Sequence, residues 1–409
     1  MRYEVLVESQ PKHLALTEAE AESLVSAGRR LASDKAWWGS AGPQEDRSVI
    51  RCTRHPMGGW SVRVVDAVGL IAVGELRLEV QPKIPLSHLL YLFGESGRFP
   101  RLGEGHVTAA VNQSLWPLVA RWYLSEAERL LRKDLLRDYQ DEAGWLSVVR
   151  GRIDVVRTEL ALARGRPEAL CEYEDFATDT ALNRTLREAA RRVSGSSVLE
   201  WSDRRRAMAI GARMPEVGKF RPIDLHARPD RRAGYYRPAI TLARHVIAGQ
   251  GRSIEHGSQD AWTFLIRTPE MVEDGVRNVL RRRLGPQWTV QKRGRQLVGS
   301  TMTLNPDLVF GDGLAVADVK YKWFGEEWAR TDLYQVVAFA TGFHTVSAAL
   351  IGFRHLVTVP VKRVRVGPIE LSELAWEANE EVSPSHAADR LASGVSQWLS
   401  ESRQRTTLG

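Results

Sequence analysis

The stretch Asn305-Pro-Asp-Leu-Val-Phe-Gly-Asp-Gly-Leu-Ala-Val-Ala-Asp-Val-Lys-Tyr-Lys322 decides how this chain is interpreted. Two apolar, β-prone runs flank Gly311-Asp312-Gly313, whose residue types tolerate positive φ, so the stretch predicts a β-hairpin. Asp307 begins the first run, while Asp318 and Lys320 lie two apart in the second and share one face. Burying these charges is costly unless something pairs them, and a divalent metal ion would do so.

The spacing Pro-Asp, ten residues, Asp-x-Lys resembles the core of the PD-(D/E)xK nucleases. That resemblance implies that Asp307 and Asp318 bind Mg²⁺, with Mn²⁺ as a substitute, and that Lys320 polarises the attacking water or the phosphate. The chemistry suits the residue types, because Mg²⁺ prefers oxygen ligands and needs only one or two carboxylates beside a substrate phosphate. Asp-x-Lys on a strand is more often a solvated edge pair, so the surrounding sequence has to decide.

The composition indicates a globular protein with two or three domains, because 409 residues are too many for one core. No apolar run approaches the roughly 18–20 residues of a membrane span, and the start of the chain is strand-like rather than a signal peptide. Cys52 and Cys171 lack the spacing of a metal site, which favours a reducing cytoplasm. The net charge of +7 favours a polyanionic partner, although a generally Arg-rich proteome explains it equally well.

Residues 1–150 predict a β-rich domain that ends in a long helix over residues 108–140. Short strands lie between residues 3 and 81, and a capping box formed by Thr17 and Glu20 opens a helix that continues to Leu31. This part contains no catalytic set of residues, and the chain has no Gly-rich loop that would cradle a nucleotide phosphate. We therefore expect it to serve packing or the docking of a partner.

Five further segments, in a fixed order along the chain, resemble the McrC family, the nuclease subunits of modified-cytosine restriction systems. The segment after the hairpin is the most specific, because it places Gln335 one turn inside a helix that directly follows Asp-x-Lys. Gln335 can then point back at the hairpin and orient water or phosphate. The segments are Leu76–Pro85, Trp145–Asp154, Asp179–Leu186, Tyr236–Arg244 and Thr331–Ala340.

Three residues of these segments are expected to have no catalytic role. Lys83 follows a proline and has the pattern of a solvated turn residue, whereas Asn183 and Arg184 are expected to stabilise the structure. Asp179 or Thr180 can cap the helix that contains them, and Thr331 or Asp332 can cap the helix that contains Gln335.

The McrC resemblance also implies an acid on the helix that precedes the hairpin. The sequence from Phe264 to Leu284 predicts that helix, with Pro269 in its first turn. The family pattern places the acid at Glu273, as a further metal ligand, with Asp274 as the alternative. Basic residues around the hairpin are candidates for contacts with DNA phosphates: Arg281, Arg282, Arg283, Lys292, Arg293, Arg295 and Lys322.

The predicted fold is a multidomain α+β or α/β protein. It combines an N-terminal β-rich module (1–150), a helical and basic middle section (151–255), and a PD-(D/E)xK restriction-endonuclease-like α/β core with a helical tail (256–409). The resemblance implies a Mg²⁺-dependent endonuclease for double-stranded DNA that docks through its N-terminal part on a McrB-type AAA+ GTPase ring, in a hetero-oligomer, and stimulates it. A non-catalytic activator of the ring and a stand-alone repair or recombination nuclease remain as alternatives.

Overall fold

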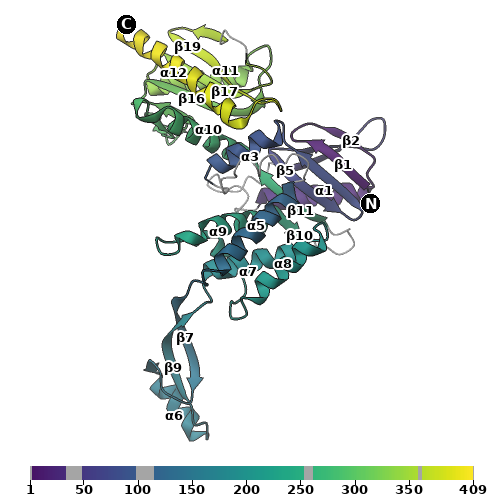
Figure 1. Ribbon diagram of the computed structural model, residues 1–409, viewed down its shortest axis with the longest axis vertical. Coiled ribbons are helices and arrows are strands. Elements are labelled where there is room, and N and C mark those ends of the chain that lie inside the picture. The colour runs from purple at the N-terminus through teal and green to yellow at the C-terminus, as the bar shows by residue number, and fades with distance from the viewer. Residues whose placement is uncertain (1, 34–47, 98–114, 253–260, 358–361, 409) are drawn as a thin grey trace. The chain divides into compact units, whose positions relative to one another are not determined.

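The computed structural model describes residues 2–33, 48–97, 115–252, 261–357 and 362–408 (Figure 1). The chain forms two compact units, one made of Met1–Leu118 together with Gly249–Gly409 and the other of Val119–Ala248. These divisions differ from the boundaries near residues 150 and 255 that the sequence suggests. The first unit is discontinuous in sequence, so its N-terminal and C-terminal parts share one body.

A five-stranded sheet joins the two ends of the first unit. Its order is β1-β6-β5-β11-β10, in which β1 is parallel to β6 and the other pairs are antiparallel. All seven residues of β5 are buried, as expected of a central strand. The strands are β1 (Arg2–Val7), β5 (Ala67–Val73), β6 (Leu76–Gln81), β10 (Gln250–Arg252) and β11 (Ala261–Arg267).

Strand β11 corrects one prediction. The sequence led us to expect a helix from Phe264 onwards, but Phe264 to Arg267 belong to β11, and helix α10 covers Pro269–Arg283. A short apolar run such as Phe264-Leu-Ile fits either structure, and pairing with the distant β5 decides it. At Gly69 the backbone has φ +143°, and a Cβ would lie 2.0 Å from the carbonyl oxygen of Phe264, so only glycine permits this approach.

A second, three-stranded sheet and helix α1 cover the N-terminal part. The predicted capping box is confirmed, since the Glu20 amide donates to Thr17 Oγ1 (3.3 Å) and the Thr17 amide donates to Glu20 (2.8 Å). An apolar core links this helix to both sheets. The sheet order is β2-β4-β3, and the elements are β2 (Lys12–Leu14), α1 (Glu18–Ser33), β3 (Ile50–Arg54) and β4 (Trp60–Val64).

The C-terminal part of the first unit is built on a six-stranded mixed sheet of order β12-β15-β16-β17-β19-β18. Strands β16, β17 and β19 run parallel, and the other pairs are antiparallel. Helix α11 packs on β16 and β17, whereas α12 packs on β19. The elements are β12 (Val290–Gln291), β15 (Leu308–Phe310), β16 (Ala315–Trp323), α11 (Arg330–Phe343), β17 (Ser347–Arg354), β18 (Arg363–Val366), β19 (Ile369–Glu377) and α12 (Pro384–Leu408).

Helix α3 (Leu86–Glu95) attaches the N-terminal part to this sheet. It packs against α10, where a Cβ at Gly275 would lie 2.5 Å from the carbonyl oxygen of Leu92. His88 accepts a hydrogen bond from Trp376 Nε1 (2.9 Å) and donates from its other ring nitrogen to the Asn379 carbonyl (2.9 Å). The N-terminal and C-terminal parts are therefore bonded through buried contacts.

The second unit contains helices and one long antiparallel hairpin (Figure 1). Strands β7 (Asp138–Leu146) and β9 (Ala169–Ala177) pair over nine residues, and β8 (Arg152–Ile153) and helix α6 (Val155–Ala163) lie between them in sequence. The hairpin corrects the predicted helix over 108–140, since α5 covers only Leu115–Leu131, and the part before Leu115 lies outside the described residues. The other helices are α7 (Ala181–Ser194), α8 (Trp201–Ala212) and α9 (Arg237–Gly249).

Several polar side chains of this unit form hydrogen bonds with one another or with nearby backbone carbonyls. Thr180 caps α7, Asn183 donates to the carbonyls of Leu136 (2.8 Å) and Thr178 (2.7 Å), and Tyr236 donates to Asn183 (2.7 Å). Arg184 forms two 2.9 Å bonds with the buried carboxylate of Asp224. The structural roles expected for Asn183 and Arg184 are confirmed. None of the described helices is long and apolar enough to cross a membrane.

Candidate metal-dependent nuclease site

The predicted hairpin is present as β15 and β16. Leu308 pairs with Ala317 and Phe310 with Ala315, and the turn uses Gly311 and Gly313 at φ +57° and +100°. Strand β15 is shorter than expected and begins after Asp307. The short β15 leaves the Asp307 side chain free to bond across the hairpin.

Asp307 is buried and fixed beside Asp318. Its Oδ2 accepts a hydrogen bond from the Val319 amide (3.0 Å), and its carbonyl accepts one from Arg277 Nε (2.9 Å). The side chains of Asp307 and Asp318 are only 11 % and 4 % exposed to solvent. The Asp307 carboxylate therefore lies directly against Val319, the residue that follows Asp318.

Lys320 connects the second strand to helix α11. Its Nζ lies 2.6 Å from Asp318 Oδ2 and donates to Gln335 Oε1 at 2.8 Å. The structure therefore brings Asp307, Asp318, Lys320 and Gln335 together, and Gln335 remains solvent-exposed. Helix α11 is capped by Ala329, so the caps expected at Thr331 or Asp332 are wrong. The Asp332 carboxylate instead forms an ion pair with Lys322.

The neighbouring acids Glu273 and Asp274 of helix α10 interact with different residues. Asp274 forms an ion pair with Arg277 (2.5 Å). Burial raises the pKa of Glu273, and the negative charge of Asp307 raises it further, with Lys292 acting in the opposite direction. Of the two acids considered for this helix, Glu273 is therefore the one whose charge acts on the hairpin carboxylates.

The electrostatics of the cluster indicate an excess of negative charge. Burial raises the pKa of Asp318, and the Asp307 carboxylate raises it further. Burial lowers the pKa of Lys320, but the nearby carboxylates, Asp318 first among them, together outweigh that effect, so the net shift is upward. Among the described residues, no three His, Cys, Asp or Glu side chains are arranged to hold a metal ion together. The donor set that remains is the pair of aspartates, which is enough for Mg²⁺ when a substrate phosphate supplies further oxygens.

The predicted DNA-contacting residues have different surroundings. Lys292 Nζ lies 3.8 Å from Asp307 Oδ1, which places it at the site. Arg281 donates to the Val290 carbonyl, whereas Arg282 and Arg283 form ion pairs with Glu95 and Asp389. Arg293 and Arg295 are exposed. Lys292, Arg293 and Arg295 are therefore better placed for DNA than Arg282 and Arg283.

A second acid–lysine cluster, which the sequence analysis missed, contacts β16 at Tyr321. Lys83 is not the solvated turn residue expected: its Nζ donates to the Tyr321 carbonyl (3.2 Å) and lies 4.6 Å from the centre of the Tyr321 ring. Glu8 is fully buried and accepts a hydrogen bond from Thr268 Oγ1. Burial raises the pKa of Glu8 to about 7, against the charge of Lys83. These residues are far apart in sequence, and only the prolines around Lys83 hinted at a fixed segment.

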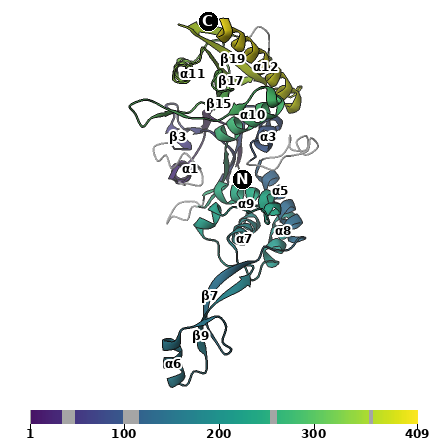
Figure 2. The same cartoon turned by 90° about the vertical axis from the view of Figure 1, so that its left-hand side faces the viewer.

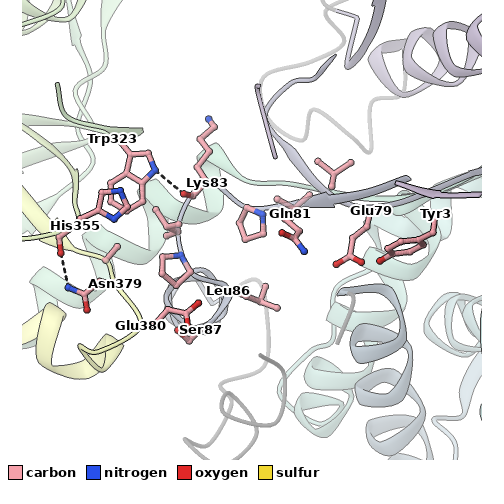
Figure 3. A pocket seen from close by; sticks show the side chains of 16 residues that line it. Tyr3, Glu79, Gln81, Lys83, Leu86, Ser87, Trp323, His355, Asn379 and Glu380 are labelled. Atoms are coloured by element: carbon pink, nitrogen blue, oxygen red, sulfur yellow. Dashed lines mark hydrogen bonds between the residues drawn. The ribbon is translucent and has the colours of Figure 1, made fainter. Parts of the chain in front are cut away.

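Next to this cluster lies a cavity of about 970 Å³. Figure 3 shows Trp323 and His355 side by side in it; their rings stack at 3.9 Å, and Trp323 Nε1 donates to the Lys83 carbonyl at 2.9 Å. Neither Asp318 nor Lys320 lines the cavity, so it is separate from the carboxylate site.

Comparisons with known proteins agree with this architecture. Residues 62–351 match the family model described as "McrBC 5-methylcytosine restriction system component". A solved structure of Thermococcus gammatolerans McrB AAA+ hexamers with bound McrC contains a chain that is 13 % identical, with a TM-score of 0.67 over 97 % of this chain and all of that one. A cryo-EM structure of the Thermococcus gammatolerans McrBC complex matches 69 % of this chain and 88 % of the other, at 13 % identity and a TM-score of 0.47. No curated protein matches the sequence.

The family match covers most of the chain and includes strands β5, β6 and β11, helix α10, the β15–β16 hairpin and Gln335. The structural likeness extends the same conclusion to the fold of nearly the whole chain. The resemblance found in the sequence is confirmed: this chain belongs to the McrBC family of restriction-system components and has the fold of McrC.

Proposed function

We propose that this chain is the Mg²⁺-dependent DNA endonuclease subunit of a McrBC-type restriction system, with Mn²⁺ as a substitute ion. The observation that carries the proposal is the cluster of Asp307, Asp318, Lys320 and Gln335 on a PD-(D/E)xK-like hairpin and the following helix. Asp307 and Asp318 would hold the ion, and Glu273, whose raised pKa favours its protonated form without the ion, would ionise when the ion binds. When bound, such an ion supplies a Lewis acid for the phosphate and lowers the pKa of water.

The protein residues have separable tasks in this proposal. Because the pKa of Lys320 is raised, its side chain stays protonated and stabilises negative charge on the phosphate instead of accepting a proton. Gln335 holds the Lys320 ammonium between its own amide and the Asp318 carboxylate, which fixes the direction of that charge. Lys292, beside Asp307, is placed to contact a phosphate on the other side of the site.

The partner of this nuclease would be an AAA+ GTPase ring of McrB type, as bound by the McrC chain in the solved structure. The β7–β9 hairpin offers a contact surface, since helix α6 between its strands is apolar in sequence and has no buried residue. Val155, Val156 and Leu160 of α6 are 60 %, 69 % and 54 % exposed. Leaving several large apolar side chains of one helix in water is unfavourable, and a partner that covers them recovers that free energy.

Residues 1 to about 150 were expected to dock the ring, and a deletion of that segment would be the simplest test. Point substitutions on α6 are a better test, because the deletion would disrupt the first unit. The deletion would remove β1, β5 and β6 from the sheet that β11 completes, and also helix α3, which packs on α10. Val155→Ser with Val156→Ser leaves the first unit intact, and Glu159→Gln on the same helix is a matched control.

The decisive experiment mixes the full-length chain with its ring partner and measures GTP hydrolysis and DNA cleavage together. We expect stimulated hydrolysis, and cleavage that EDTA abolishes. The α6 double variant should lose stimulation while Glu159→Gln keeps it. Full cleavage in EDTA would contradict the metal-dependent mechanism. Stimulation without any cleavage would favour the non-catalytic activator, and cleavage that is indifferent to the ring would favour a stand-alone nuclease.

A further inference from the structure

A basic hairpin projects from the sheet directly beside the carboxylates. It is formed by β13 (Arg295–Gln296) and β14 (Thr303–Leu304), with Arg295 opposite Leu304. Figure 2 shows it as a green hairpin that extends beyond the strands near the β15 label. From Lys292 to Pro306 the sequence has three basic residues and no acid. Such a charge distribution attracts a polyanion and gives no counter-charge of its own.

The tip of this hairpin is apolar and exposed. Val298 is 104 % exposed, Met302 62 % and Leu297 36 %. The turn is nonetheless ordered by its own hydrogen bonds, from the Leu297 amide to the Met302 carbonyl (2.9 Å) and from the Ser300 amide to the Leu297 carbonyl (3.2 Å). Single exposed apolar residues are common on proteins, but three at one ordered tip form a defined contact surface.

The root of the hairpin lies at the candidate site. Lys292 at its start is 3.8 Å from Asp307, and Asn305 at its end precedes Asp307 by two residues. Gly294 leaves room for the Asn305 side chain, since a Cβ there would lie 2.3 Å from Asn305 Oδ1. A phosphate held at Asp307 and Asp318 is therefore at the foot of the hairpin, and the tip points to another part of the same DNA.

We propose that the β13–β14 hairpin lies in the major groove of the DNA duplex that is cut, with Arg293 and Arg295 on phosphates and Val298 against the floor of the groove. The proposal rests on the nuclease function proposed above. Six residues separate Lys292 from Val298, and at ~3.3 Å per residue the hairpin reaches about 20 Å, far enough to enter the groove from a backbone phosphate.

Groove width decides between the two grooves. Paired strands lie ~4.8 Å apart before their side chains are added, so a two-stranded ribbon fits the major groove of about 12 Å and not the minor groove of about 6 Å. The major groove also exposes the thymine C5-methyl group, which apolar side chains contact. An apolar tip on a basic stem thus matches a groove with a partly apolar floor between two rows of phosphates.

The first test measures DNA binding by the full-length chain with its ring partner in Ca²⁺. Arg293→Gln with Arg295→Gln should reduce the slope of log affinity against log salt by about two, because each lost phosphate contact lowers it by ~0.9. Val298→Ser should weaken binding about fivefold and leave the slope unchanged. Val366→Ser, an exposed valine elsewhere in the first unit, and Arg365→Gln are the controls and should bind like wild type.

The second test identifies the groove by changing the DNA. Uracil in place of thymine removes only the major-groove methyl, whereas inosine in place of guanine removes the minor-groove amino group. Wild type should bind the uracil duplex at least twofold more weakly, and Val298→Ser should bind both duplexes equally. Sensitivity to inosine alone would place the hairpin in the minor groove and overturn the proposal.

Two other results would also overturn it. Hairpin variants that bind and cut DNA like wild type would remove the hairpin from DNA recognition while leaving the nuclease function standing. Loss of GTPase stimulation with unchanged DNA binding in Val298→Ser would assign the tip to the ring. If wild type neither binds DNA in Ca²⁺ nor cuts it in Mg²⁺, the proposed function itself fails, and this inference with it.

Discussion

Two acid–lysine clusters contact neighbouring residues of strand β16, and they differ in access to solvent. Glu8, Lys83 and Thr268 enclose Tyr321, and Glu8 has no exposed surface. Asp318 and Lys320 lie beside helix α11, where Gln335 is exposed. The buried Glu8 joins separate segments of the protein, because Thr268 donates to its carboxylate and the charge of Lys83 acts on it, and it cannot reach water without losing these interactions. An open cluster with more carboxylates than cations can exchange its counter-charge for a metal ion and a phosphate.

The largest expected effect is the loss of DNA cleavage when a charged residue of the Asp307–Asp318–Lys320 cluster is replaced. Asp307→Asn, Asp318→Asn or Lys320→Met should each lower DNA cleavage by roughly 10²–10³-fold or more, because each removes a charge that the metal ion or the transition state requires. Plasmid cleavage in Mg²⁺ with the ring partner measures it. Asp312→Asn, an exposed acid in the same hairpin, should cut normally. Normal cutting by Asp318→Asn would remove this cluster from catalysis.

Exchange of the metal ion should have the next largest effect. Ca²⁺ accepts more ligands and looser geometry than Mg²⁺, so it should support DNA binding while lowering cleavage at least about 100-fold. Gel-shift and cleavage assays on the same samples check both parts. Efficient turnover in Ca²⁺ would show that the open cluster does not position an in-line attack.

A smaller effect is expected at Gln335. Gln335→Ala removes one hydrogen bond from Lys320, worth about 1–1.5 kcal/mol, so cleavage should fall about tenfold. GTP hydrolysis by the ring should stay unchanged. Thr331→Ala on the same helix is the control, and an equal loss in both variants would mean that the helix, and not the contact with Lys320, is responsible.

Glu8→Gln should have the smallest effect on cleavage and a clear effect on stability. The raised pKa means that folded Glu8 keeps its proton between about pH 4.5 and about 7 while the unfolded chain releases it. The folded state therefore loses stability as pH rises through that window, by roughly 3 kcal/mol.

The Glu8→Gln variant should lack the part of the pH dependence of stability that comes from Glu8. Apparent melting temperatures from pH 5 to 8 should fall less steeply in Glu8→Gln than in wild type. Glu273 and Asp318 titrate in both proteins, so the difference between the two slopes isolates Glu8. Parallel curves would show that Glu8 does not titrate in this range.

The open cluster could be predicted from the sequence because it is local. Asp307, Asp318, Lys320 and Gln335 lie within 29 residues on one hairpin and one helix, where strand alternation and helical spacing fix their faces. Glu273 could be placed only through the family resemblance. The sealed cluster could not be found, since Glu8, Lys83, Thr268 and Tyr321 come from four distant segments that no local period relates.

The same distinction applies to the fold. The capping box at Thr17 and strands β1, β3, β4, β5 and β6 follow local patterns, and they were predicted. Strand β11 and the β7–β9 hairpin were missed, because each is defined by a partner far along the chain or by a pairing that competes with helical spacing. The discontinuous first unit has the same cause, since nothing near Phe264 indicates that its neighbour is β5.

That discontinuity has a consequence for biosynthesis. Strand β5 is synthesised long before its partner β11. The whole of Val119–Ala248 leaves the ribosome between them. Long-range pairing of this kind is slow, and domains whose residues are contiguous tend to fold first on the ribosome. The second unit can therefore fold while the first is incomplete. Because Asp307, Asp318 and Gln335 are translated after that, a chain released early lacks the assembled carboxylate cluster.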